Sequence, residues 1–155
     1  MSKKLEGNGR WESSRMMLPE HREQFLQQRA PQSPVQVPTK EELEWVRDCI
    51  LLPMMLSVVE KNSRDIELSF YSMKPLYIRA SHALMTIIHR DLDAVRKELK
   101  AHKIKVYQDE MESEGGAIHY RFVCRGYEDR FSIIRDVARA EISVGISKYI
   151  AKMFK

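Results

Sequence analysis

Apolar residues recur at helical spacing along three long stretches of the chain. The first stretch follows Thr39 and Glu42, whose spacing is that of a capping box, in which each side chain bonds the backbone N–H of the other residue. We expect Pro53 to kink this helix or to break it into two. The second stretch covers residues 76–102 and the third covers residues 128–154, so the pattern predicts two further amphipathic helices.

Alternation of apolar and polar residues predicts strands between these helices. Residues 65–73 alternate in this way and are followed by Pro75, so we expect a strand there. Residues 104–106 and 118–124 also alternate, and the Gly115–Gly116 pair between them is typical of a hairpin turn. The order is therefore helix–strand–helix–strand–strand–helix. It predicts an α+β fold in which long amphipathic helices pack on a small antiparallel sheet.

The composition divides the chain into three parts. Residues 1–29, which we call the leader, mix charged and small residues with a short predicted helix that begins at Pro19. Residues 30–39 contain three of the six prolines and are typical of a semi-extended linker. Residues 40–155 then form a single α+β domain.

Size and charge limit the class of protein. The chain has 155 residues, of which 43% are hydrophobic and 31% charged, so it can build a core and wholesale disorder is excluded. Its net charge of +4 supports only weak attraction to nucleic acid. We expect a cytoplasmic protein that does not engage a membrane, because no signal peptide pattern is present and the longest apolar run is short. Two cysteines without metal-ligand spacing agree with a reducing compartment.

No arrangement of residues points to catalysis. His82 and His89 are seven residues apart on one predicted helix, which is too far for a shared metal ion. Cys124 has no base that can be assigned to it, and its place in a strand pattern favours the core. We therefore expect no catalytic residues, no metal and no cofactor, and we expect that the protein is not an enzyme.

Arginines interleaved with aromatic residues between positions 120 and 139 offer a nucleic-acid site as an alternative function. Guanidinium groups contact phosphates, and aromatic rings stack on bases. Interspersed acidic residues make this affinity weak. The candidate residues are Arg121, Arg125, Tyr127, Arg130, Arg135 and Arg139. The broad apolar faces of the two later helices also favour a homo-oligomer, although these faces can simply pack on each other.

The leader contains three consecutive large apolar residues within the stretch WESSRMMLPEH, residues 11–21. Adaptable methionine side chains beside a leucine, at the start of a short helix, suit docking into a groove of a partner protein. Folding back onto the body of the chain is an equally open interpretation. The candidate partner-binding residues are Trp11, Arg15, Met16, Met17, Leu18, Pro19, Glu20 and His21.

The same stretch resembles the opening of YolD-like proteins, a small bacterial and phage family. The resemblance extends over roughly residues 3–25, in which a tryptophan precedes a Met-Leu-Pro-Glu-His signature. It implies a small accessory protein that works alongside error-prone DNA polymerases of the damage response. The predicted function is therefore that of a non-enzymatic accessory or regulatory protein, from a bacterium or its phage, that acts through protein–protein contacts.

Overall fold

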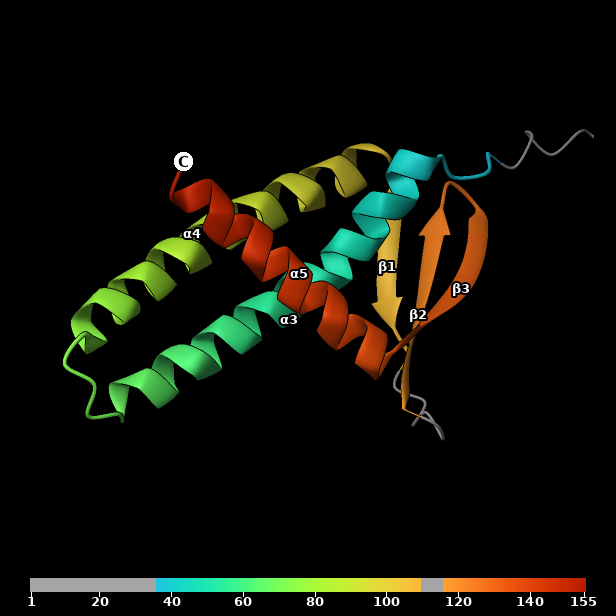
Figure 1. The fold of residues 1–155 in the computed structure, drawn as a ribbon. Helices are drawn as coiled ribbons and strands as arrows, with labels where there is room; N and C mark the ends of the chain where they lie inside the picture. Colours follow the sequence, from blue (N-terminus) through green and yellow to red (C-terminus); the bar gives the residue numbers. More distant parts are fainter. Residues whose placement is uncertain (1–35, 110–115) are drawn as a thin grey trace, which may run out of the picture. The chain divides into compact units, whose positions relative to one another are not determined.

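The computed structural model describes residues 36–109 and 116–155, so the leader and its predicted partner-binding residues lie outside the described residues. Three helices and one three-stranded antiparallel sheet are found in the described part (Figure 1). In chain order they are α3 (Lys40–Glu67), α4 (Lys74–Ala101), β1 (Ile104–Gln108), β2 (Ala117–Cys124), β3 (Tyr127–Ile134) and α5 (Arg135–Met153). The predicted α+β class is confirmed.

The predicted capping box at the start of α3 is confirmed. The backbone N–H of Glu42 donates to Thr39 Oγ1 at 3.3 Å, and the backbone N–H of Thr39 donates to Glu42 Oε2 at 2.9 Å. α3 continues through Pro53 as one helix, so the predicted break into two helices is wrong. The helix changes direction near its middle, where Pro53 lies (Figure 1). Proline has no N–H to donate and its ring crowds the preceding turn, which bends a helix without ending it.

The predicted strand at residues 65–73 is wrong. Residues 65–67 form the last turn of α3, and residues 68–73 connect it to α4. Pro75 lies in the first turn of α4, a position that suits proline because the N–H groups there have no partner inside the helix. The Ser69 hydroxyl donates to the Ile66 carbonyl at 2.6 Å and helps to end α3. α3 and α4 therefore form a helical hairpin.

Residues 128–134, predicted as the start of the last helix, belong instead to strand β3. The reason is the Arg125–Gly126 turn, in which both residues have positive φ, 47° and 88°. Such two-residue turns match the twist of paired strands and reverse the chain into a hairpin. β2 and β3 pair antiparallel with Cys124 opposite Tyr127, and the predicted pairing of β1 with β2 is confirmed with Ile104 opposite Cys124.

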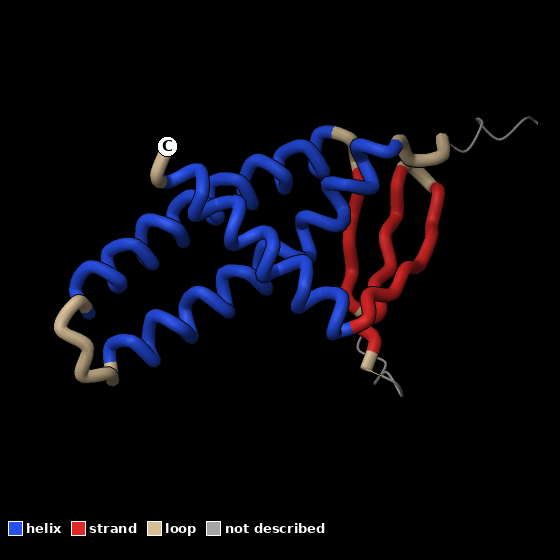
Figure 2. Tube along the Cα trace, viewed as in Figure 1, coloured by secondary structure: helices blue, strands red, loops and turns tan. Residues whose placement is uncertain are grey.

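The sheet stands at one end of the helices, and the connection between α3 and α4 lies at the other end (Figure 2). One face of the sheet is buried, because Tyr120, Phe122 and Cys124 alternate along β2 with less buried residues. These side chains join Val46 of α3 and Ile88 of α4 in one core. The opposite face carries polar residues. No helix in the described ranges is long and apolar enough to cross a membrane.

Candidate functional site

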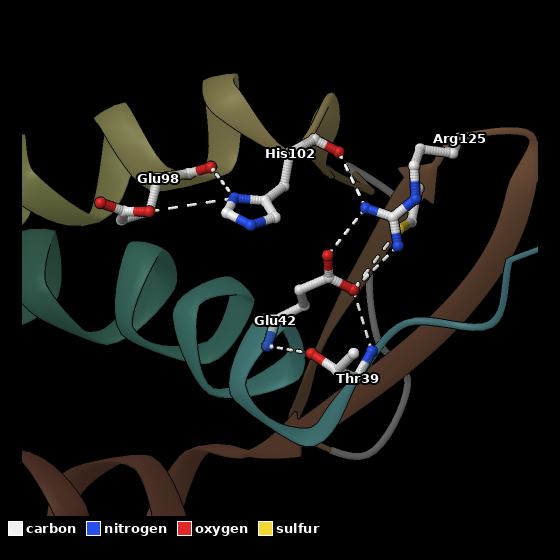
Figure 3. A network of polar contacts seen from close by, with 6 residues as sticks. Thr39, Glu42, Glu98, His102 and Arg125 are labelled. Carbon is white, nitrogen blue, oxygen red and sulfur yellow. Dashed lines mark hydrogen bonds and ion pairs between the residues drawn. The ribbon is translucent and has the colours of Figure 1, made fainter.

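A buried ion pair joins α3 to the turn between β2 and β3 (Figure 3). The Arg125 guanidinium donates to both carboxylate oxygens of Glu42, from Nη1 to Oε1 at 2.7 Å and from Nη2 to Oε2 at 3.0 Å. Nη1 also donates to the His102 carbonyl at 3.1 Å, just past the end of α4. One guanidinium therefore holds together the first turn of α3, the end of α4 and the hairpin turn. Arg125 supplies this contact from a left-handed backbone conformation, which costs energy for a residue with a Cβ.

The Glu42 carboxylate of this ion pair stays ionised at neutral pH. The hydrogen bond from Arg125 lowers the pKa of Glu42 from 4.5 to about 2, although burial acts in the opposite direction. Glu42 is only 4% exposed, so an unpaired charge at this position would be costly. The capping contact from Thr39 also favours the ionised form. Glu42 is therefore a structural anion and not a proton donor.

The residues around the ion pair are held by burial, packing and hydrogen bonds. Burial raises the pKa of the Cys124 thiol, whose Sγ lies 4.0 Å from Glu42 Oε2, so this thiol stays protonated. The His102 ring packs against Trp45 at 4.8 Å between centroids, and its Nδ1 lies 2.9 Å from the Glu98 carbonyl oxygen. Within the described ranges, no group of three or more His, Cys, Asp or Glu side chains is arranged to hold a metal ion.

Two of the predicted nucleic-acid residues meet on the outer face of the sheet. Arg121 of β2 is the register partner of Arg130 of β3, and this face is not covered by the described helices. The Arg121 guanidinium lies 5.1 Å from the ring centroid of Tyr107 and donates to Glu128 Oε1 at 3.0 Å. Strand register places Lys105 of β1 and Glu128 of β3 on the same face. The outer face therefore combines three basic side chains and one acidic side chain with one exposed aromatic ring.

The other predicted nucleic-acid residues lie elsewhere. Arg125 is engaged by Glu42, and the Tyr127 hydroxyl donates to Asp129 Oδ2 at 3.2 Å. Arg135 and Arg139 lie at the start of α5, where Arg139 pairs with Asp136 at 3.5 Å. The structure thus brings together Arg121 and Arg130 and separates them from the rest of the predicted set.

An apolar hollow of about 420 Å³ lies between the start of α3, strand β3 and the start of α5. The Arg47–Glu141 ion pair borders it and links α3 to α5, with Arg47 Nε donating to Glu141 Oε2 at 3.2 Å. Its apolar lining includes Leu43, Val46, Phe122, Phe131, Ile133 and Val137. Such a hollow accepts an apolar side chain and not a charged group.

The connection between α3 and α4, together with the first turn of α4, exposes large apolar side chains that we call the hairpin tip. Lys74 holds the backbone there, because its Nζ donates to the carbonyls of Glu67 and Ser69 at 2.9 and 3.3 Å. The sequence prediction missed this surface because it assigned the segment to a strand. Pro75 was the available signal, since proline at a helix start marks the residues before it as a connection. The hairpin tip consists of Leu68, Phe70, Tyr71, Met73, Leu76 and Tyr77.

These features define an α+β protein built on a helical hairpin, with exposed apolar surfaces and a buried polar network. A family model described as YhjD protein matches residues 37–154, and the chain belongs to the YhjD family. The chain is similar to "Uncharacterized protein YhjD" of Bacillus subtilis (strain 168), with 27% identity over 111 residues that cover 72% of this chain and 91% of the relative. No solved structure matches the chain. The leader lies outside the matched residues, and its YolD-like resemblance is not confirmed.

Proposed function

We propose that this protein is a non-enzymatic accessory protein whose hairpin tip docks into an apolar cleft of a partner protein. The observation that supports this most directly is the exposure of six large apolar side chains together at the tip. If each contributes about 200 Å² when fully exposed, their exposed fractions amount to roughly 800 Å². That area is what each partner contributes to a standard stable interface. Phe70 and Tyr71 are the expected anchors, since aromatic side chains dominate binding energy at interfaces.

The polar network supports binding over catalysis. The Glu42 carboxylate is neutralised by Arg125, and burial keeps the Cys124 thiol protonated. Neither group is presented to a substrate, because both residues are buried. In this proposal the protein acts by binding a partner protein through its exposed surface.

Site-specific photo-crosslinking tests the proposal in a bacterium that encodes this protein. A photoreactive amino acid replaces Phe70 in the full chain, and a matched control carries it at Asp93, an exposed position on α4. We expect a covalent adduct of one defined mass from position 70 and none from position 93. The partner in this adduct is then purified, and a chain with Phe70→Ser and Tyr71→Ser should bind it at least tenfold more weakly. Absence of an adduct at position 70, or identical adducts at both positions, refutes docking through the tip.

The leader supplies a second docking segment in this proposal. Its YolD-like resemblance suggests a partner among the DNA polymerases of the damage response. Met17→Asp with Leu18→Asp should release such a polymerase from the full chain, while Lys3→Asp, in the polar start of the leader, should not. If the polymerase binds both variants equally, or binds neither variant nor the natural chain, the damage-response link through the leader is wrong.

The outer face of the sheet favours a second candidate function, weak binding of single-stranded nucleic acid. Arg121 and Arg130 lie side by side there with Tyr107, which can stack on a base. Fluorescence anisotropy with a labelled oligonucleotide at low salt measures this binding. Arg130→Glu should weaken it about tenfold, whereas Arg79→Glu, an exposed charge reversal on α4, should have a much smaller effect. Equal weakening by both variants would show that only the net charge matters and would reject this face as a site.

A further inference from the structure

Helix α5 carries two opposite apolar faces, of which the described residues cover only one. Ala138 and Ile142 on one face are buried in the core. The other face is exposed, and its small or apolar residues are spaced alternately three and four residues apart. This is the heptad spacing of a seam between two helices. We call this set the α5 stripe; it consists of Val137, Ala140, Val144, Ser147, Ala151 and Phe154.

The stripe contains no charged residue and can be buried without an unsatisfied polar group. Its one polar member, Ser147, already donates its hydroxyl to the Ser143 carbonyl at 3.0 Å. Arg135 and Arg139, the basic residues at the start of the helix, fall outside the heptad positions of the stripe. A surface with these properties is suited to pack on another helix.

We propose that a second copy of this chain covers the stripe, with the two α5 helices packed antiparallel about a two-fold axis. The charges beside the stripe support this orientation. Glu141, whose carboxylate also accepts from Arg47 of its own chain and is 30% exposed, flanks the first half of the stripe, and Lys148 flanks the second half. In an antiparallel pair, Glu141 of each copy lies beside Lys148 of the other, so two attractive contacts form. The two helix dipoles are also opposed, which favours the pair.

The apolar hollow provides the second argument for a copy of the same chain. Val137 lies at the first end of the stripe and lines the hollow, and Phe154 lies at the last end and is 79% exposed. Antiparallel packing brings the Phe154 of each copy level with the Val137 of the other. Each aromatic ring then has an apolar hollow of about 420 Å³ beside it. The same surface of each copy thus supplies Phe154 as an anchor and the apolar hollow as its pocket. A two-fold interface requires a surface that is complementary to itself in this way.

Analytical ultracentrifugation of the full chain over a concentration series tests the proposal. We expect the natural chain to form a dimer, and Val144→Glu to raise its dissociation constant about 100-fold or more, because two carboxylates would be buried in each seam. Arg139→Glu introduces the same side chain on the same helix outside the stripe and should leave the dissociation constant unchanged. Circular dichroism confirms that both variants fold. A natural chain that stays monomeric throughout, or a Val144→Glu chain that dimerises normally, overturns the proposal.

Disulfide crosslinking tests the orientation. Antiparallel packing places position 140 of one copy beside position 151 of the other, and it separates the two copies of position 140 by about 16 Å along the helix. A chain with Ala140→Cys and Ala151→Cys should therefore form a covalent dimer, whereas Ala140→Cys alone should not. A covalent dimer from the single variant shows parallel packing and overturns the antiparallel arrangement. Phe154→Ala should raise the dissociation constant about 30-fold if its ring is an anchor in the hollow, and an unchanged value would remove that contact.

Discussion

Replacing Glu42 with glutamine removes the charge of the buried ion pair and keeps the capping box. Glutamine is accepted at the third position of a capping box, so the start of α3 should remain intact. The glutamine cannot match the Arg125 guanidinium with two charged oxygens, and this partly buried cation is left without its counter-ion. The variant thus isolates the contribution of the charge.

The magnitude follows from the pKa of Glu42. A pKa lowered from 4.5 to about 2 corresponds to about 3 kcal/mol of stabilisation of the ionised folded state. Water reaches the Arg125 side chain, which is 24% exposed, and the resulting screening reduces this figure. We therefore expect Glu42→Gln to lower the free energy of unfolding by about 2 kcal/mol at pH 7.

The pH dependence gives the sign of the effect. Because the folded-state pKa lies below the ordinary value, the stabilisation is complete above about pH 4.5 and is lost as the pH falls towards 2. The natural chain should lose about 2 kcal/mol more than Glu42→Gln across this range. Urea unfolding at pH 7, 5, 4 and 3 measures the difference between the two chains.

Glu41→Gln is the matched control for Glu42→Gln. Glu41→Gln removes a neighbouring exposed carboxylate from the same helical turn and should change the free energy of unfolding by less than about 0.5 kcal/mol. If the natural chain and Glu42→Gln lose the same stability between pH 5 and 3, the pKa of Glu42 is not lowered. The ion pair would then contribute nothing through its charge.

Three further substitutions test the packing by urea unfolding. Ile88→Ala removes a side chain with no exposed surface and should cost about 3 kcal/mol, so a loss below about 1 kcal/mol would place Ile88 outside the core. Gly126→Ala adds a Cβ at a φ of 88° and should cost about 1 kcal/mol, whereas no loss would show that the turn adopts another conformation. Tyr149→Phe removes the hydroxyl that donates to Asp91 Oδ2 at 2.8 Å and should cost about 1 kcal/mol, and an unchanged stability would mean that water replaces this bond.

Local signals in the sequence predicted the parts of the fold that depend on near neighbours. The capping box of Thr39 and Glu42 needs only residues three positions apart, and the structure contains it. The amphipathic helix predicted from helical spacing over residues 128–154 is present as α5 from Arg135 onward. The β1–β2 pairing follows from two alternating segments on either side of a glycine pair.

Two errors arose where one local pattern fits two structures. The alternation of Ile66, Leu68 and Phe70 resembles a strand, but these residues end a helix and form its connection, and no described strand lies beside them. Phe131 fits either the face of a helix or the inner face of a strand. The Arg125–Gly126 turn reverses the chain and places Phe131 in a strand. The sequence did not indicate this turn, because arginine is unusual at a position with positive φ.

The candidate sites bring together residues that are far apart in the sequence, and such contacts are hard to predict from local patterns. Arg125 resembles the other arginines of its segment in the sequence, and only the structure shows that Glu42, 83 residues away, engages it. Arg121 and Arg130 were predicted as part of one set, and strand register places them together. The α5 stripe has a readable period, but its exposure becomes clear only when the buried face of the helix is known.

The separation of 83 residues between Glu42 and Arg125 has a consequence for the order of folding. The α3–α4 hairpin closes a short loop, whereas the ion pair requires nearly the whole domain to be in place. We expect the ion pair to form after the main barrier, so Glu42→Gln should accelerate unfolding and leave the refolding rate almost unchanged. The ion pair would then slow unfolding and so lengthen the lifetime of the native state. It would have little effect on the rate of folding.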